Sequence, residues 1–249
     1  MKKPSLWVFG FGQFMEFFTP YIRPYFDIYI YDKNGKKEAI ENLWVQAASL
    51  SQTASCDFVL LGYPAGAIAK LCQEIVPYIA DGASVFDICS VQTPAVDAMK
   101  TYLPAHCNIF TIHPVFGPQS GKNGIKDLKC MFYNISCKEE VYQNFRDIFE
   151  NDLGLLIFEM SPEEHDREMA YIQWLSHFIG RTLKKMSIPD APLATNSYKH
   201  LRETSELVWY DSQDLFYSIQ SDNPFVAEVR EQFLKEIHSL NTWIQNKNI

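Results

Sequence analysis

Short apolar runs alternate with amphipathic stretches over roughly the first 160 residues of the chain. Six of these runs have the length and composition of buried strands, and they occupy residues 6–9, 26–31, 58–61, 84–88, 108–112 and 155–158. Helical periodicity lies between several of them, as at residues 65–78 and 139–149. This alternation predicts a parallel sheet with helices on both faces.

The pattern changes near residue 161. Ten of the eleven glycines lie at or before Gly154, and none follows Gly180. The tetrad Ser161-Pro162-Glu163-Glu164 is typical of a helix start, with serine as the N-cap and proline in the first turn. Helical periodicity then runs to about residue 186, and after a break at 188–192 we expect helices over about 194–221 and 224–246. The sequence therefore predicts an α/β domain, residues 1–160, followed by a smaller all-helical domain, residues 161–249.

Charge and composition exclude several kinds of partner. The formal net charge is −8, which disfavours nucleic acid or an anionic membrane as the main partner. No apolar run reaches the ~20 residues that span a bilayer, and the first residues do not have the pattern of a secretion signal. The six cysteines show no C-x-x-C spacing, and no spacing of histidines, cysteines or acids suggests a metal site. We expect a cytoplasmic protein without a metal.

A glycine turn follows the first predicted strand. Gly10 and Gly12 stand where a tight turn brings the backbone close to a pyrophosphate at the start of a helix. Asp32 ends the second strand, 22 residues after Gly10, where an acid accepts hydrogen bonds from the ribose hydroxyls. This arrangement predicts a Rossmann-type, doubly wound sheet that binds NAD.

Two features of the turn keep alternatives open. Met15 replaces the third glycine of the usual pattern, so a simple turn in a flavodoxin-like domain is the other interpretation. Lysines 33, 36 and 37 lie next to Asp32 and leave the choice between NAD and NADP open. The residues that we expect to contact the cofactor are Gly10, Gly12, Gln13, Phe14, Asp32 and Pro64.

Three further segments carry groups suited to chemistry. They are Asp87-Ile-Cys-Ser90-Val-Gln92 after the fourth strand, His113-Pro-Val-Phe-Gly-Pro118 after the fifth, and His165-Asp-Arg-Glu-Met-Ala-Tyr-Ile-Gln173-Trp-Leu-Ser-His177-Phe in the helical half. Ligands of open α/β sheets bind beyond the carboxyl ends of the strands, where Ser90 and His113 fall. With these motifs in this order, the chain resembles the prephenate dehydrogenase family, which oxidises prephenate or arogenate in tyrosine biosynthesis.

The resemblance implies roles for these residues. His113 would take the proton of the ring hydroxyl while hydride leaves to NAD, and Ser90 would hold the imidazole in the correct tautomer. A neutral histidine suits a general base near neutral pH. Considered alone, His113 could instead cap a strand end, and His165 could make only a capping contact.

The prephenate dianion needs cations to bind it, and the resemblance points to the second half of the chain. Gln173 and His177 are four residues apart, so they share a helix face, and both are candidate substrate contacts. His177 could alternatively be a satisfied histidine between the domains. Lys199 stands where the family has an arginine, and Arg202 follows one helical turn later. Gln92 replaces the family's lysine after Ser-Val.

Aromatic residues are abundant in the helical half, more than a bundle of about 90 residues easily buries, which predicts a homodimer through this domain. The alternative is one tightly packed core. For function, the leading interpretation is an NAD-dependent prephenate dehydrogenase. The alternatives are an arogenate dehydrogenase, a related hydroxy-acid dehydrogenase, and a degenerate protein that binds NAD without turnover.

Overall fold

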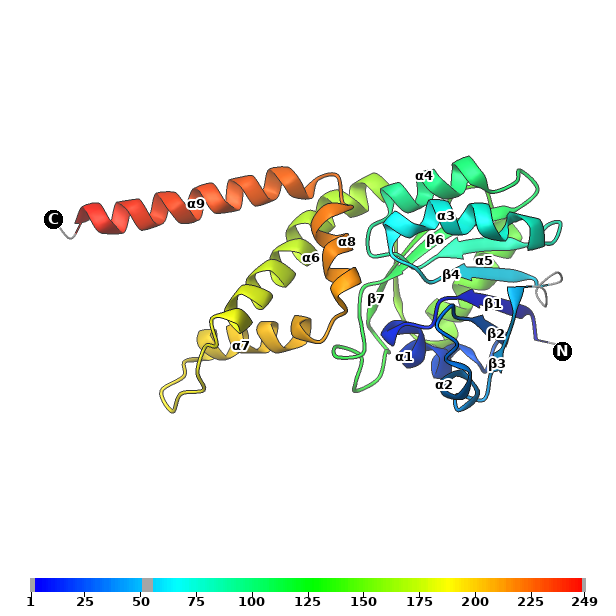
Figure 1. Ribbon diagram of the computed structural model, residues 1–249, viewed down its shortest axis with the longest axis horizontal. Helices are drawn as coiled ribbons and strands as arrows, with labels where there is room; N and C mark the ends of the chain where they lie inside the picture. The colour runs from blue at the N-terminus through cyan, green and yellow to red at the C-terminus, as the bar shows by residue number, and fades with distance from the viewer. Residues whose placement is uncertain (1–2, 51–55, 248–249) are drawn as a thin grey trace. The chain divides into compact units, whose positions relative to one another are not determined.

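The computed structural model describes residues 3–50 and 56–247. The chain divides into two compact units, Met1–Pro162 and Glu163–Ile249. The first unit is built on a sheet and the second contains helices (Figure 1).

One eight-stranded sheet forms the centre of the first unit, in the order β3-β2-β1-β4-β5-β6-β7-β8. Strands β1 to β6 run parallel, β7 is antiparallel to β6, and β8 is parallel to β7. The strands are β1 (Ser5–Phe9), β2 (Asp27–Tyr31), β3 (Gln46–Ala47), β4 (Phe58–Leu61), β5 (Ser84–Asp87), β6 (Asn108–Pro114), β7 (Lys129–Asn134) and β8 (Leu156–Glu159).

Helices cover both faces of this sheet (Figure 1). Side chains alternate along β1: Leu6 and Val8 belong to one buried cluster, and Trp7 and Phe9 belong to the other. The first cluster also takes residues of α1 and α5, and the second takes residues of α3 and α4. The helices are α1 (Gln13–Ile22), α2 (Lys37–Glu41), α3 (Ala65–Ile75), α4 (Thr93–Tyr102) and α5 (Glu139–Asp147). The expected doubly wound α/β fold is therefore confirmed, with β7 and β8 reversing the direction of the sheet at one side.

The second unit consists of α6 (Pro162–Lys185), α7 (Asn196–Trp209), α8 (Gln213–Ser221) and α9 (Val226–Lys247). Trp174 of α6 is fully buried in a small core with residues of α8 and α9. Gly180 allows α6 and α7 to approach closely, since a Cβ there would lie 2.5 Å from Val208 Cγ2.

The expectation of a single helix over about 194–221 is wrong. The chain leaves the helix at Trp209 and starts α8 at Gln213. Ser212 caps the new helix, because its hydroxyl accepts a hydrogen bond from the Leu215 N–H. In the part of the chain that the structure describes, none of the helices is long and apolar enough to cross a membrane.

Candidate active site

The residues singled out in the first unit follow neighbouring strands at one edge of the sheet. Gly10 comes after β1, Asp32 after β2, Pro64 after β4 and Ser90 after β5, while His113 is the next-to-last residue of β6. These strands are parallel, so their carboxyl ends share that edge. The chain order reverses between β1 and β4, which is the position where open α/β sheets bind their ligands.

The glycine turn has the geometry that close approach to a ligand requires. Gly10 has a φ of +96°, and a Cβ there would lie 2.7 Å from the carbonyl oxygen of Gly62. A side chain is thus excluded both by conformation and by space. Gly12 precedes α1 in extended conformation, and a Cβ at Gly12 would meet nothing within 4 Å. The backbone in front of α1 is open, as a bound phosphate would require.

Asp32 is held beside this turn. Its Oδ2 accepts a hydrogen bond from the Phe11 N–H at 3.0 Å, and its Oδ1 accepts one from the Asn34 N–H at 2.8 Å. Lys36 Nζ donates to the Phe11 carbonyl at 2.7 Å. Lys33 Nζ lies 5.8 Å from the centre of the Tyr63 ring. A carboxylate and two ammonium groups therefore border the same loop.

The other expected cofactor residues also lie at this edge. Gln13 is exposed and Phe14 is half-buried in the first turn of α1. Pro64 is exposed and precedes α3 as its N-cap. Burial, with a smaller contribution from the charge of Asp32, raises the pKa of the neighbouring Tyr63 hydroxyl.

His113 and Ser90 belong to adjacent strands. His113 lies in β6 opposite Met131 of β7, with only 3% of its surface exposed. Ser90 is half-buried in the bend after β5. The register pairs Asp87 with Thr111. Ser90 lies three residues after Asp87, and His113 lies two residues after Thr111.

Sequence reasoning missed a buried polar network beneath these two residues. Asp87, Gln92 and Thr111 each have 0% exposure. Thr111 Oγ1 lies 2.5 Å from Asp87 Oδ1 and also contacts Gln92 Oε1. Gln92 therefore faces the interior of this unit, and it does not supply a polar group at the protein surface. Only the strand register brings these residues together, and no spacing pattern in the sequence indicates their contact.

The helical candidates are placed within the second unit. Gln173 is half-buried and His177 has 8% of its surface exposed. His177 Nδ1 lies 2.8 Å from the carbonyl oxygen of Gln173, and its Nε2 lies 2.9 Å from Asp211 Oδ2. Both ring nitrogens thus contact acceptors of this unit, and the histidine ties α6 to the connection between α7 and α8. His165, at the start of α6, contacts Asp166 Oδ1 through its Nδ1 at 2.9 Å.

The two candidate cations on α7 have different surroundings. Lys199 is exposed. Arg202 is half-buried, and its Nη1 forms an ion pair with Oδ1 of the exposed Asp190. Lys199 is therefore the more accessible charge, whereas Arg202 would have to exchange a carboxylate of its own chain for one of a substrate.

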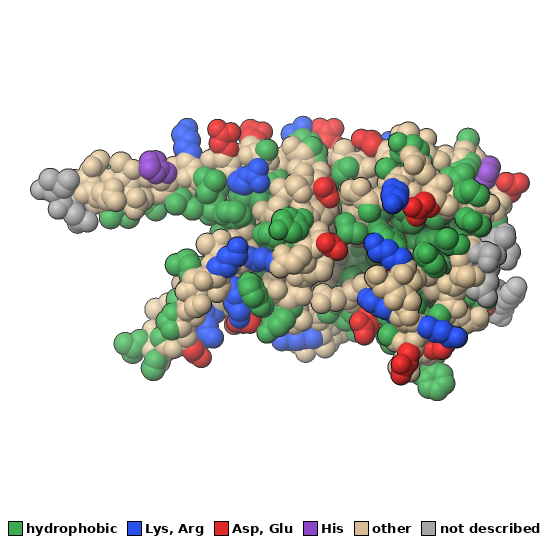
Figure 2. All heavy atoms as spheres, viewed as in Figure 1, with side chains coloured by type: hydrophobic (Ala, Val, Ile, Leu, Met, Phe, Trp, Pro, Cys, Tyr) green, Lys and Arg blue, Asp and Glu red, His purple; other side chains and the backbone are tan. Residues whose placement is uncertain are grey.

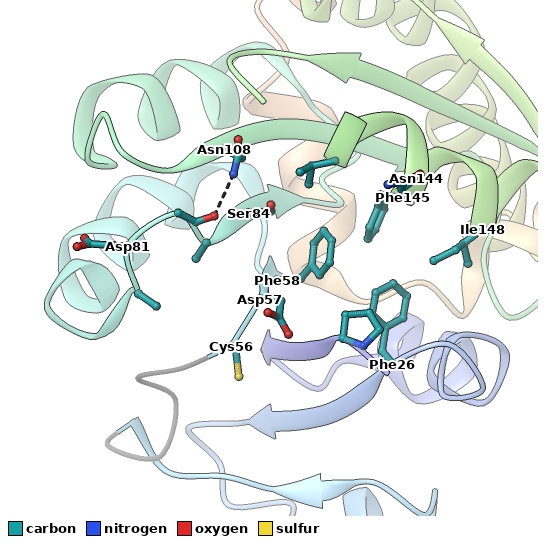
Figure 3. Close-up of a pocket in the computed structure, with 15 residues that line it drawn as sticks. Phe26, Cys56, Asp57, Phe58, Asp81, Ser84, Asn108, Asn144, Phe145 and Ile148 are labelled. Atoms are coloured by element: carbon teal, nitrogen blue, oxygen red, sulfur yellow. Dashed lines mark hydrogen bonds between the residues drawn. The ribbon is translucent and has the colours of Figure 1, made fainter. Parts of the chain in front are cut away.

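A pocket of about 560 Å³ lies at the opposite edge of the sheet (Figure 3). Its lining includes Phe58, Ser84 and Asn108, which are the first residues of β4, β5 and β6. Asn108 Nδ2 donates to the carbonyl oxygen of Gly82 at 3.0 Å (Figure 3). None of the expected site residues lines this pocket. Among the described residues, no group of three or more histidines, cysteines and acids could hold a metal ion.

Two family models match the chain. Residues 24–133 match the model of the prephenate dehydrogenase nucleotide-binding domain, and residues 161–249 match the prephenate dehydrogenase dimerization domain. The chain belongs to the prephenate dehydrogenase family. The glycine turn lies before the first matched residue, so the match to the nucleotide-binding domain does not depend on it.

Curated relatives include arogenate dehydrogenases. The chain is 34% identical to arogenate dehydrogenase 1 of Arabidopsis thaliana over 161 residues, which cover 63% of this chain and 25% of that protein. It is 24% identical to a probable arogenate/prephenate dehydrogenase of Methanocaldococcus jannaschii over 199 residues, which cover 77% of this chain and 44% of that protein. The matched region thus spans less than half the length of each of these relatives.

Solved structures of the family share the fold. Prephenate dehydrogenase from Aquifex aeolicus, in complex with hydroxyphenyl propionate and NAD+, superposes with a TM-score of 0.75 at 20% identity, covering 99% of this chain and 92% of that one. Synechocystis arogenate dehydrogenase superposes with a TM-score of 0.66 at 17% identity, covering 98% and 93%. At this level of identity the likeness concerns the fold.

Proposed function

We propose that this protein is an NAD-dependent dehydrogenase that oxidises and decarboxylates prephenate. One observation carries the proposal: in a chain of this family, a buried histidine and a neighbouring serine lie at the edge of the sheet that also bears the glycine turn. That edge is where a nucleotide and a substrate meet in such sheets.

The residues of the first unit fit a dinucleotide. The backbone of Gly10 and Gly12 and the start of α1 would hold the pyrophosphate, and Asp32 would accept hydrogen bonds from the adenosine ribose. Gln13, Phe14 and Pro64 would border the cofactor. NAD, when bound, supplies the hydride acceptor.

His113 acts as the general base in this proposal. Its imidazole takes the proton of the ring hydroxyl as the adjacent carbon is oxidised to a ketone, and Ser90 orients the ring. Two ring double bonds connect the ketone to the quaternary carbon that bears the carboxylate, so the ketone oxygen can take up the electrons that decarboxylation releases and then a proton. Loss of CO2 leaves its bonding electrons in the ring, which becomes aromatic, so the product is 4-hydroxyphenylpyruvate.

Arogenate is the second candidate substrate, and two observations favour it. Arogenate dehydrogenases are among the curated relatives. In addition, the family's lysine after Ser-Val is replaced by the buried Gln92, and Lys199 stands where the family has an arginine. Fewer cations suit arogenate better, because its side-chain amine reduces the net negative charge of the substrate.

We also propose that the protein is a homodimer through its helical unit, with α9 at the interface. From Leu234 onward the described residues of α9 are all exposed. They include a stripe of large apolar side chains, visible along α9 in Figure 2: Leu234, Ile237, Leu240, Trp243 and Ile244. Ile237, Leu240 and Ile244 follow the three-and-four spacing of a helix seam. The exposed part of α9, residues 234–247, would be marginal in water as an isolated helix, so packing against a second copy would stabilise it.

The experiment that tests the substrate assignment is a comparison of kcat/KM for prephenate and arogenate, each with NAD. A higher value for prephenate supports the proposal as stated. A higher value for arogenate would keep the chemistry and change the substrate.

A further inference from the structure

We propose that Gln92, Thr111 and a protonated Asp87 form a neutral buried network that positions Ser90 and His113. This inference rests on the function proposed above, because it assigns a purpose to groups that lie directly beneath the two catalytic candidates.

Gln92 contacts the peptide groups that precede both catalytic candidates. Its Nε2 donates to the carbonyl oxygen of Cys89 at 2.6 Å and to that of Ile112 at 3.4 Å. The first carbonyl belongs to the peptide bond that joins Cys89 to Ser90, and the second belongs to the bond that joins Ile112 to His113. One amide group thus ties the loop after β5 to the end of β6.

These two contacts fix the orientation of the Gln92 amide. The NH2 group has two protons, and both carbonyl partners are acceptors, so the nitrogen must face them. The opposite orientation would set an amide oxygen against two carbonyl oxygens. Oε1 therefore faces Thr111 and accepts a hydrogen bond from its hydroxyl.

This donation leaves Thr111 without a proton for Asp87. A hydroxyl has one proton to give, yet Thr111 Oγ1 also lies 2.5 Å from Asp87 Oδ1. Two oxygens at that separation need a proton between them. Asp87 supplies it when it is a carboxylic acid and donates to Thr111. Its other oxygen accepts a hydrogen bond from the Cys89 N–H at 2.8 Å.

The surroundings of Asp87 favour this neutral form. Complete burial is the largest cause that raises the pKa of the Asp87 carboxyl, to about 6, while the hydrogen-bond contacts of this carboxyl with Thr111 and Cys89 act in the other direction. The titratable groups that face it among the described residues are thiols, Cys72 of α3 and Cys89 in the loop after β5. No lysine, arginine or histidine forms an ion pair with Asp87 within the described ranges.

Infrared spectroscopy tests the bound proton without any need for activity. At about pH 5.5 an ordinary aspartate is ionised. The difference spectrum between the wild type and Asp87→Asn should then contain the C=O stretch of a carboxylic acid, and this band should disappear as the pH rises. A difference spectrum with only carboxylate bands at that pH would overturn the assignment, whatever the enzyme turns over.

Kinetics test the positioning role. Below about pH 6, Asp87→Asn keeps the geometry, since its amide nitrogen can donate to Thr111 as the acid does, and kcat should there stay within about threefold of the wild type. Thr111→Val and Gln92→Glu break the network, and each should lower kcat about tenfold or more while the Kd for NAD stays within about twofold. Thr111→Ser should restore most of the activity.

The pH profile adds a readout that a purely structural role would not affect. The ratio of kcat for Asp87→Asn to kcat for the wild type should rise with pH, because the wild type loses the bound proton and the amide does not. Two results would overturn the proposal: a folded, NAD-binding Asp87→Asn variant without activity, or a Thr111→Val variant with wild-type kcat. A wild type that turns over neither substrate would contradict the proposed function and leave the infrared test intact.

Discussion

At the scale of single residues, the proposed chemistry depends on His113, which lies almost fully buried in β6. Bulk water has little access to a base in this position, so solvent does not compete with a substrate for hydrogen bonds to the imidazole. Its neighbour Ser90 lies in the bend after the adjacent strand, so the sheet holds His113 and a short connection to the sheet holds Ser90. Positioning of this kind is what general-base catalysis requires.

Replacing His113 by asparagine removes the base and keeps a polar side chain of similar size. We expect kcat to fall by about 10²- to 10⁴-fold, the usual contribution of a general base, with little change in the Kd for NAD. Steady-state kinetics together with titration of NAD binding measure both quantities. Wild-type activity in His113→Asn would rule out the base assignment.

Asp32 should determine the choice of nucleotide. Its carboxylate repels a 2′-phosphate, and Lys33 and Lys36 beside it can attract one. Asp32→Ala should therefore raise kcat/KM with NADP relative to NAD by about tenfold or more. Asp97→Ala, at an exposed carboxylate on α4, is the matched control for the loss of one negative charge. An unchanged preference would mean that Asp32 does not contact the ribose.

Lys199 and Arg202 should contribute unequally to binding of the substrate carboxylates. Lys199 is exposed, whereas Arg202 forms an ion pair with Asp190. Alanine at Lys199 should raise KM for prephenate about tenfold, and alanine at Arg202 should have a smaller effect. If Arg202→Ala has the larger effect on KM, the guanidinium of Arg202 is the main binding group for a substrate carboxylate. If neither variant changes KM, both residues are surface charges.

At the scale of elements, the sequence predicted the six strands that it named, because each is a short apolar run followed by a turn or a helix. It missed the two-residue strand β3, and it missed β7, whose residues 129–134 follow a glycine-containing loop. Its antiparallel pairing with β6 depends on how that loop returns to the sheet, which periodicity does not encode. The single helix expected over 194–221 failed for a local reason, since the Ser212 cap was not recognised.

The candidate site also contains residues that the sequence can locate and contacts that only the structure shows. Gly10, Asp32, Ser90 and His113 stay predictions, and each lies at or within three residues of the carboxyl end of an apolar strand, where sequence spacing can locate it. The network below them was not found, because Asp87 and Thr111 are 24 residues apart and meet only through the register of β5 and β6. Sequence spacing locates groups at the end of a strand, whereas contacts across strands need the structure.

Helix α9 provides the test at the level of an element. Ile237→Asp places a charge in the exposed apolar stripe and should dissociate the proposed dimer by raising its Kd about tenfold or more. Ser239→Asp, also exposed on α9 and outside the stripe, is the matched control. Sedimentation over a range of protein concentrations reports the result. A monomeric wild type, or equal effects of the two variants, would exclude α9 as the interface.

At the scale of the whole molecule, the protonation of Asp87 links stability to pH. Its pKa is raised in the folded state to about 6, against an ordinary value of 3.8. Between these values the folded protein holds a proton that the unfolded chain releases. The stabilisation is therefore complete below about pH 4 and is lost as the pH rises through about 6.

Asp87→Asn cannot ionise and should escape this loss. Its Tm should be close to or below that of the wild type at about pH 4.5 and above it at about pH 8. At the higher pH its unfolding free energy should exceed that of the wild type by up to about 3 kcal/mol. Thermal unfolding followed at both pH values measures the difference. A variant that is less stable than the wild type at the higher pH would show that the folded state needs the carboxylate charge.

The most direct test of the proposed reaction is NADH formation by the purified protein supplied with prephenate and NAD, with His113→Asn assayed in parallel. The account predicts steady turnover by the wild type, with release of CO2 and 4-hydroxyphenylpyruvate in equal amounts to NADH, and almost none by the variant. Measurable NAD binding without turnover of either prephenate or arogenate would contradict it, and would indicate a protein that binds the dinucleotide without performing the chemistry.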